Sequence, residues 1–209
     1  MSIVIIDYGS GNLRSAKKAF SHMADKAGGR SVIVTSDPQT VRAGDHIILP
    51  GVGSFGDCYA GLAAIDGMIE TLHDTVLKGG RPFLGICVGM QLMCARGLER
   101  GTHQGLGWFE ADVTPLNIDT SLKVPHMGWN NLSLARAHKI FDGLEGADMY
   151  FVHSYAAQTC APDMLASVDY GGPVIAAMGR DNMVGTQFHP EKSQQNGLRL
   201  ISNFLEWRP

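Results

Sequence analysis

The sequence contains one cysteine in a setting that suits nucleophilic chemistry. Cys87 is at the centre of Gly85-Ile86-Cys87-Val88-Gly89, directly after a short apolar run. This Gly-x-nucleophile-x-Gly pattern is typical of a sharp strand-to-helix turn, where small flanking residues let the two elements pack closely. The turn raises the nucleophile above the strand ends, beside a helix N-terminus that favours a thiolate. The plainer alternative is a cysteine buried between two packing glycines.

A cysteine nucleophile needs a base, and the base needs a group that orients it. His189 follows an apolar run that predicts a strand, and Pro190 ends that strand. Side chains at i and i+2 of an extended segment point to the same face, so the Glu191 carboxylate can reach the His189 imidazole. We therefore predict a Cys87, His189 and Glu191 triad, in which Glu191 fixes the imidazole tautomer. The alternative is a histidine and a glutamate at a strand end without a catalytic role.

A second glycine-rich segment, residues 51–56, has the spacing Gly-x-Gly-x-x-Gly. The same spacing marks dinucleotide-binding turns, but those follow the first strand of a fold and need an acidic residue after the next strand. Here the segment follows the third apolar run, and the next run ends at Cys87. We interpret the turn as a source of backbone N–H groups for an oxyanion, together with the N–H of Val88. A purely steric turn is the alternative.

These residues need a scaffold that brings strand ends together. Short apolar runs predict buried strands at residues 3–6, 32–34, 47–49 and 81–86. Apolar residues at helical spacing separate them, with Asn12 as the expected cap of the first helix and a second helix over residues 62–76. Cys94 is expected two turns along the helix that follows Cys87. The alternation predicts an α/β fold with a mostly parallel central sheet flanked by helices.

The second half of the chain is predicted to be rich in β-structure. Short apolar stretches separated by turns indicate hairpin-like strands at residues 108–113, 149–152, 164–168, 174–178 and 183–188. Residues 117–141 carry mixed signals and are expected to be largely loop, and a helix closes the chain. We find no linker or internal repeat in the sequence, so we expect residues 1–209 to form a single domain.

The composition excludes several classes of function. The 17 Lys+Arg and 20 Asp+Glu give a formal charge of -3 without a basic block, which argues against nucleic acid and anionic membranes as partners. No apolar run approaches the ~20 residues of a membrane span. None of the four cysteines forms a Cys-x-x-Cys pair, which argues against a zinc site or a redox dithiol. We predict a cytoplasmic enzyme without a metal site, in which Cys58, Cys94 and Cys160 are packing residues.

The turn at Cys87, the glycine turn and residues 187–193 (Gln-Phe-His-Pro-Glu-Lys-Ser) together resemble the class I (triad) glutamine amidotransferases. Residues 5–13, 124–130 and 150–155 resemble, more specifically, the glutaminase subunits of imidazole glycerol phosphate synthases. The resemblance implies a flavodoxin-like fold, no cofactor, and hydrolysis of glutamine to glutamate and ammonia. It also implies a heterodimer with a cyclase subunit, which uses the ammonia to form imidazole glycerol phosphate and aminoimidazole carboxamide ribotide in histidine biosynthesis.

The resemblance implies roles for individual residues. Cys87 attacks the amide carbon, and His189, oriented by Glu191, passes the proton to the leaving ammonia. The oxyanion is held by the backbone of Gly51, Val52, Gly53 and Val88. The amino and carboxylate groups of glutamine are recognised by Gln91, Glu99 and Ser154. The segments 125–130 and 150–155 face the cyclase subunit, and the expected contacts are Lys192, His126, Asn130 and Tyr150.

The same residues fit two further enzyme hypotheses. A triad amidotransferase that serves a different synthase, such as a sugar-modifying one, would keep the triad and differ in its partner surface. A cysteine hydrolase of γ-glutamyl peptides would act without a partner.

The triad predicts that the four cysteines differ in reactivity. A glutamine-like electrophile should modify Cys87 selectively, because that thiol alone is expected to be activated beside a glutamine site. Peptide mass spectrometry after brief labelling measures the modified fraction at each cysteine. Equal labelling of Cys58, Cys87, Cys94 and Cys160 would instead support a non-enzymatic binding module.

Overall fold

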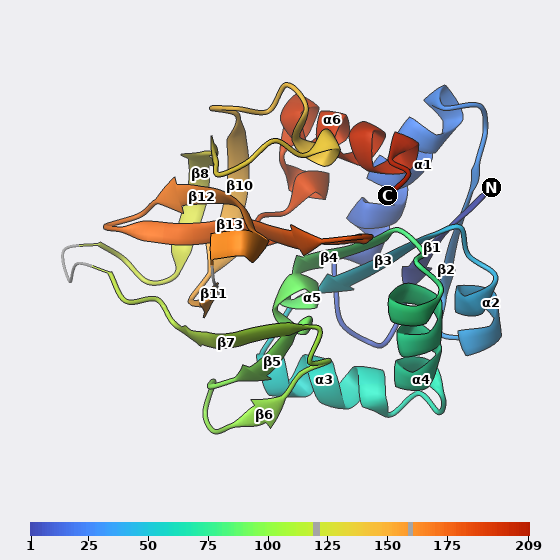
Figure 1. The fold of residues 1–209 in the computed structure, drawn as a ribbon, viewed down its shortest axis with the longest axis horizontal. Helices are drawn as coiled ribbons and strands as arrows, with labels where there is room; N and C mark the ends of the chain where they lie inside the picture. Colours follow the sequence, from blue (N-terminus) through green and yellow to red (C-terminus); the bar gives the residue numbers. More distant parts are fainter. Residues whose placement is uncertain (119–121, 159–160) are drawn as a thin grey trace.

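The structure, a computed structural model, describes residues 1–118, 122–158 and 161–209. Its centre is a mixed sheet in the strand order β2-β1-β3-β4-β14-β13-β12-β9 (Figure 1). Five neighbouring strands are parallel: β2 (Ser31–Thr35), β1 (Ser2–Ile6), β3 (His46–Gly51), β4 (Phe83–Cys87) and β14 (Met183–Thr186). The other three are antiparallel: β13 (Pro173–Arg180), β12 (Met164–Asp169) and β9 (Ser133–Leu134). The predicted α/β class with a mostly parallel sheet is confirmed.

Helices cover both faces of the parallel strands. Figure 1 shows α1 (Leu13–Lys26) and α6 (Gln194–Glu206) on one side of the sheet, with α3 (Phe55–Ala63) and α4 (Met68–Leu72) on the other. The shorter helical turns are α2 (Pro38–Arg42), η1 (His73–Lys78), α5 (Val88–Gln91), η2 (Lys139–Phe141), η3 (Ala161–Asp163) and η4 (Pro190–Lys192). Residues 3–6 of β1 are fully buried, because a strand covered on both faces has no solvent side.

Two smaller sheets carry much of the second half of the chain. One pairs β10 (Asp148–His153) with β8 (His126–Asn131) in antiparallel register. The other has the order β11-β7-β5-β6, formed by β11 (Tyr155–Gln158), β7 (Phe109–Pro115), β5 (Cys94–Gly97) and β6 (His103–Gln104). Within the described residues, no helix is long and apolar enough to cross a membrane.

Three predictions about helices were wrong in detail. Asn12 occupies the N-cap position of α1 but makes no capping hydrogen bond with its side chain. The helix expected over residues 62–76 is divided, because Gly67 adopts a left-handed φ of 72° between α3 and α4. The helix after Cys87, α5 (Val88–Gln91), ends early, so Cys94 begins a strand. The carbonyls of Leu92 and Cys94 accept backbone hydrogen bonds from residues 106 and 107, which a longer helix would exclude.

The prediction that residues 117–141 are largely loop holds only for part of the stretch, of which residues 119–121 lie outside the described residues. The strands β8 and β9 and the turn η2 lie in this stretch. The alternation of apolar inward and polar outward residues that marks a strand is absent from β8. Its buried residue His126 is polar, and the exposed side chains of Met127 and Trp129 are apolar. Cys58, Cys87 and Cys94 are free and buried, whereas Cys160 lies outside the described residues.

Candidate active site

Cys87 ends β4 and immediately precedes α5. Its backbone has φ 55° and ψ -111°, an angle pair that a residue with a Cβ rarely adopts. Cys87 occupies the N-cap position of α5 in this conformation and lines the cavity described below. Only 4% of Cys87 is exposed. The geometry is the sharp strand-to-helix turn expected from the sequence, with the sulfur held at the end of a buried strand.

The glycines on either side of Cys87 allow the close packing of this turn. An added Cβ on Gly85 would lie 2.6 Å from the carbonyl oxygen of Gly89. An added Cβ on Gly89 would overlap the carbonyl oxygen of Leu49, on the neighbouring strand β3. Backbone atoms cannot rotate away as a flexible side chain can, so α5 reaches the sheet only with glycine at these positions.

His189 lies beside Cys87 because β14 is the parallel neighbour of β4. Its Nδ1 is 2.9 Å from Oε1 of Glu191, and both side chains are 2% exposed. The backbone of His189 is fixed on both sides, because its N–H donates to Tyr150 and its carbonyl accepts from the Ser193 hydroxyl. The other Glu191 oxygen, Oε2, is buried without a partner among the described residues. His189 is therefore the group that stabilises the Glu191 carboxylate.

The electrostatics of the pair favour a charged imidazole. Burial alone would lower the pKa of His189, but hydrogen bonds and charge interactions with Cys87 and Glu191 outweigh it and raise that pKa to about 10. At neutral pH the structure therefore favours imidazolium at His189, between a carboxylate and the sulfur of Cys87. This arrangement can hold a thiolate for attack and a proton for a leaving group.

The start of the glycine turn, together with Pro50 before it, lies next to Cys87, since Gly51 pairs with Cys87 in the β3–β4 register. Two side chains fix the carbonyls of this turn. The hydroxyl of Tyr8 donates to Pro50 over 2.8 Å, and the thiol of Cys58 donates to Val52 over 3.6 Å. Burial raises the pKa of the Tyr8 phenol, which keeps it a donor. Sequence reasoning missed the role of Tyr8 because its contact joins segments 42 residues apart. It treated Cys58 only as a packing residue, although the Val52 carbonyl lies six residues away in the chain.

A cavity of about 280 Å³ opens above Cys87. It is lined by most of the residues that were assigned to the site from the sequence: Val52, Gly53, Cys87, Val88, Gln91, Glu99, Ser154, His189 and Lys192. Pro125, Val152, His153 and Tyr155 complete its walls. The volume fits a small amino acid, and its polar groups come from separate elements that the fold brings to one edge of the sheet.

Two of the predicted substrate residues already make hydrogen bonds within the protein. Gln91 donates through Nε2 to the Tyr155 carbonyl and to Oε1 of Gln187, each over 3.0 Å. Glu99 accepts from the backbone N–H of Phe55 through Oε2 over 2.9 Å, which fixes the start of α3. The single oxygen of Gln91, Oε1, and the second carboxylate oxygen of Glu99, Oε1, are not used in these bonds, and both residues line the cavity.

The expected partner contacts divide into exposed and buried residues. Lys192 is exposed, with its ammonium 5.7 Å from the centre of the Tyr150 ring, and Asn130 is half-buried against the carbonyl of Asp169. His126 is only 2% exposed and stacks on the Tyr170 ring, which leaves little of its side chain for a partner to contact. Sequence analysis could not anticipate this burial, since the ring of Tyr170 comes from a distant segment.

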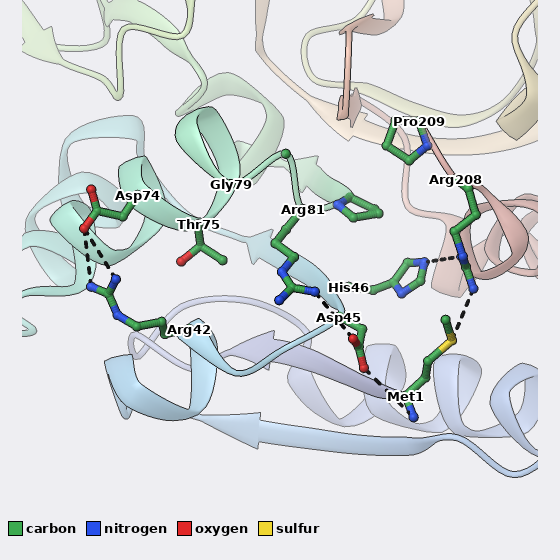
Figure 2. A pocket seen from close by; sticks show the side chains of 12 residues that line it. Met1, Arg42, Asp45, His46, Asp74, Thr75, Gly79, Arg81, Arg208 and Pro209 are labelled. Atoms are coloured by element: carbon green, nitrogen blue, oxygen red, sulfur yellow. Dashed lines mark hydrogen bonds and ion pairs between the residues drawn. The ribbon is translucent and has the colours of Figure 1, made fainter.

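A larger cavity, about 500 Å³, lies at the opposite ends of the parallel strands. Figure 2 shows its charged side chains in pairs, Arg42 with Asp74 and Arg81 with Asp45. His46 accepts from Arg208 there, and burial together with the neighbouring arginines lowers its pKa to about 4. Cys87, His189 and the residues Val52 and Gly53 of the glycine turn all line the smaller cavity, which we take as the candidate active site.

Comparisons with known proteins agree with this assignment. Residues 4–207 match the family model "Glutamine amidotransferase class-I". A solved structure described as a glutamine amidotransferase is 18% identical and superposes with a TM-score of 0.73, covering 98% of this chain and 97% of that chain. That likeness shows the fold. The fold, the site and the family model define a class-I glutamine amidotransferase.

Closer relatives define the family within this class. The chain is 56% identical to imidazole glycerol phosphate synthase subunit HisH of Brucella suis biovar 1 (strain 1330). It is 55% identical to the same subunit of Mesorhizobium japonicum (strain LMG 29417). Both alignments cover 100% of each chain. The chain belongs to the HisH family of imidazole glycerol phosphate synthase subunits.

The raised pKa of His189 predicts how activity responds to Glu191→Gln. Removing the carboxylate charge lowers the pKa of His189, so the alkaline loss of glutaminase activity moves to lower pH by about one unit or more. The wild-type enzyme keeps its imidazolium until the pH approaches about 10. The pH profile of kcat/KM measures the shift, with the exposed Glu110→Gln as the matched control. Identical alkaline limbs in both variants would show that Glu191 does not hold the proton on His189.

The same raised pKa has a consequence for stability. A histidine whose pKa is higher in the folded state contributes stability that is fully present below about pH 6.5 and is lost as the pH rises through the folded value. The loss therefore falls between about pH 6.5 and 10 in the wild type.

The packing at Gly89 predicts the outcome of Gly89→Ala. The added methyl group overlaps the Leu49 carbonyl, so the free energy of unfolding should fall by at least ~2 kcal/mol. Gly107→Ala is the control, because its methyl group would meet no atom within 4 Å and adds only the cost of a left-handed backbone, ~1 kcal/mol. Urea unfolding compares the two variants. Equal losses of stability would mean that the turn at Cys87 does not require this close approach.

Proposed function

We propose that this chain is the glutaminase subunit of an imidazole glycerol phosphate synthase. In this proposal it hydrolyses glutamine and delivers ammonia to a cyclase subunit of the histidine pathway. The observation that carries the chemistry is the buried 2.9 Å contact between His189 and Glu191 beside the strained Cys87. The identity over the full length of HisH subunits supports the particular enzyme.

The first half of the reaction forms a thioester. The Cys87 thiolate attacks the side-chain amide carbon of glutamine, and the carbonyl oxygen becomes an oxyanion. When the tetrahedral intermediate collapses, the C–N bond breaks, and the His189 imidazolium gives its proton to the leaving nitrogen, which departs as ammonia. Glu191 stabilises the imidazolium before this transfer and keeps the ring oriented after it.

The second half releases glutamate. Neutral His189 takes a proton from water, and the resulting hydroxide attacks the thioester carbon. The carbon–sulfur bond then breaks and returns the Cys87 thiolate, with the imidazolium again beside it. Glutamine and water are consumed, glutamate and ammonia are produced, and no cofactor takes part in either half.

The oxyanion needs donors that are already in place. Val88 is the first residue of α5, so its N–H has no acceptor within the helix. The turn of Gly51, Val52 and Gly53 contributes further N–H groups from the other side of Cys87. Donors that need no reorganisation during the reaction are the most effective stabilisers of a developing charge.

The substrate's polar groups would be recognised by Gln91, Glu99 and Ser154. Both N–H groups of Gln91 are used within the protein, which leaves its Oε1 as an acceptor for the substrate ammonium. Glu99 keeps Oε1 for the same ammonium, since its Oε2 binds Phe55. Ser154 lines the same cavity and completes the set.

A partner surface surrounds the cavity. Val52 lines the cavity and its side chain is exposed. Pro125 also lines the cavity, and the residue before it, Val124, is exposed. Met127 and Trp129 on β8 are 62% and 47% exposed. An apolar surface at the mouth of a site suits a permanent partner, and the relatives are named as subunits of a synthase. We propose that the cyclase subunit covers this surface, together with Lys192, Asn130 and Tyr150.

The proposal includes a cytoplasmic location, where reducing conditions keep Cys87 available as a thiol. It also treats residues 1–209 as one domain. The eight-stranded sheet supports this, because it joins strands from both halves of the chain.

The test is glutamine-dependent synthesis by the complex with the cyclase subunit. Cys87→Ala should lower the rate with glutamine at least ~10³-fold and leave the rate with ammonium salts within about twofold, because only the nucleophilic step is removed. Cys94→Ala, which changes a buried thiol outside the cavity, is the control. Loss of both rates in Cys87→Ala would mean that Cys87 supports the fold or the interface. Turnover of γ-glutamyl peptides without a partner would favour the hydrolase alternative.

A further inference from the structure

Gln187 is a fully buried amide that none of the roles above explains. Its Nε2 lies 3.7 Å from the sulfur of Cys87 and donates to it. Its Oε1 accepts from Nε2 of Gln91 over 3.0 Å. The residue follows β14 directly and is 0% exposed. The reactive sulfur therefore has a second neighbour besides His189, and this neighbour offers an N–H group.

The direction in which the Gln187 amide points is decided by groups outside it. A glutamine amide turned by half a revolution would present its oxygen to the sulfur instead. Gln91 is bonded to the backbone carbonyl of Tyr155, and a carbonyl can only accept, so Gln91 must present Nε2 there. The second hydrogen of the same Nε2 points to Gln187, which must accept it through Oε1. Gln187 is then left with its N–H groups toward Cys87.

The Tyr155 carbonyl is itself held in place by His153, which in turn is bonded to His126. Nδ1 of His153 lies 2.9 Å from this carbonyl and must carry the hydrogen, so the Nε2 of His153 is an acceptor. Nδ1 of His126 lies 3.0 Å from that Nε2 and donates to it. Burial lowers the pKa of each histidine to about 4, so both stay neutral at physiological pH and keep these tautomers. Every hydrogen bond from His126 to Cys87 thus has one fixed direction.

We propose that Gln187 is a further catalytic residue, which donates a hydrogen bond to the Cys87 sulfur and stabilises its thiolate. Gln91 and the Tyr155 carbonyl are the positioning groups that keep the Gln187 amide in this orientation. A donor to the sulfur favours the charged form, whereas an amide oxygen in the same place would oppose it. The inference rests on the proposed glutaminase function and adds a residue to its nucleophile.

The experiment measures the protonation of Cys87 without using turnover. The rate of alkylation of Cys87 by iodoacetamide is followed as a function of pH by peptide mass spectrometry. Gln187→Met keeps the length of the side chain and removes the N–H, and Gln187→Glu keeps the shape and places a carboxylate there. The exposed Gln104→Glu is the matched control for the charge change.

The proposal expects the alkylation midpoint to rise by about one pH unit or more in Gln187→Met, and further in Gln187→Glu, with no change in Gln104→Glu. Glutamine kinetics should show a lower kcat in Gln187→Met, with KM within about twofold of the wild type. A packing role alone would leave the midpoint unchanged, and that result would overturn the inference. If the wild type in complex with the cyclase subunit shows normal alkylation of Cys87 but no glutamine turnover, the proposed function fails instead.

A second measurement needs no substitution at Gln187. In wild-type protein with ¹⁵N-labelled glutamine side chains, the Gln187 amide protons should shift with pH along the alkylation curve of Cys87, because the bond strengthens when the sulfur is charged. Absence of this titration, in protein whose Cys87 titrates by alkylation, would overturn the inference even if both variants failed to fold.

Discussion

The site depends on the burial of charge at His189. An imidazolium that is almost completely removed from water is costly unless opposite charges and hydrogen bonds compensate it. Glu191 and Cys87 supply this compensation from two sides. The three groups therefore have to stay within contact distance, and the surrounding fold can be understood as the means of keeping them there.

The sheet topology provides the first part of this positioning. The strands β4 and β14 are parallel neighbours, so the residues that follow them, although distant in the chain, leave the sheet at the same edge. The glycine turn after β3 arrives at that edge on the other side of β4. Close packing at Gly85 and Gly89 then lets α5 begin directly after Cys87. The proposed nucleophile, base and oxyanion donors thus come from three adjacent strand ends.

Local rules predicted a large part of this site from sequence. The turn at Cys87 has a pattern that depends only on neighbouring residues, and Glu191 reaches His189 because the two are separated by one residue. The roles of Gln187 and Tyr8 depend instead on contacts between segments that meet only in the folded chain. The burial of His126 is of the same kind, since its aromatic neighbours come from other strands.

The errors in the fold also have physical causes. Apolar spacing after Cys87 suggested a long helix, but a later segment uses the carbonyls that such a helix would need, and Cys94 joins a strand. In β8, a polar residue faces inward and apolar residues face outward, which reverses the usual pattern. Exposed apolar side chains at this position are consistent with a surface that binds another protein.

The central claim is that His189 is held as an imidazolium by its two neighbours. Titration of the His189 ring by ¹⁵N NMR in the wild-type protein measures this directly. The account predicts a pKa near 10 and a charged ring at neutral pH, with a clear fall of the pKa in Cys87→Ala. A ring that is neutral at pH 7 to 8, with a pKa at or below its ordinary value of about 6.5, would contradict the account.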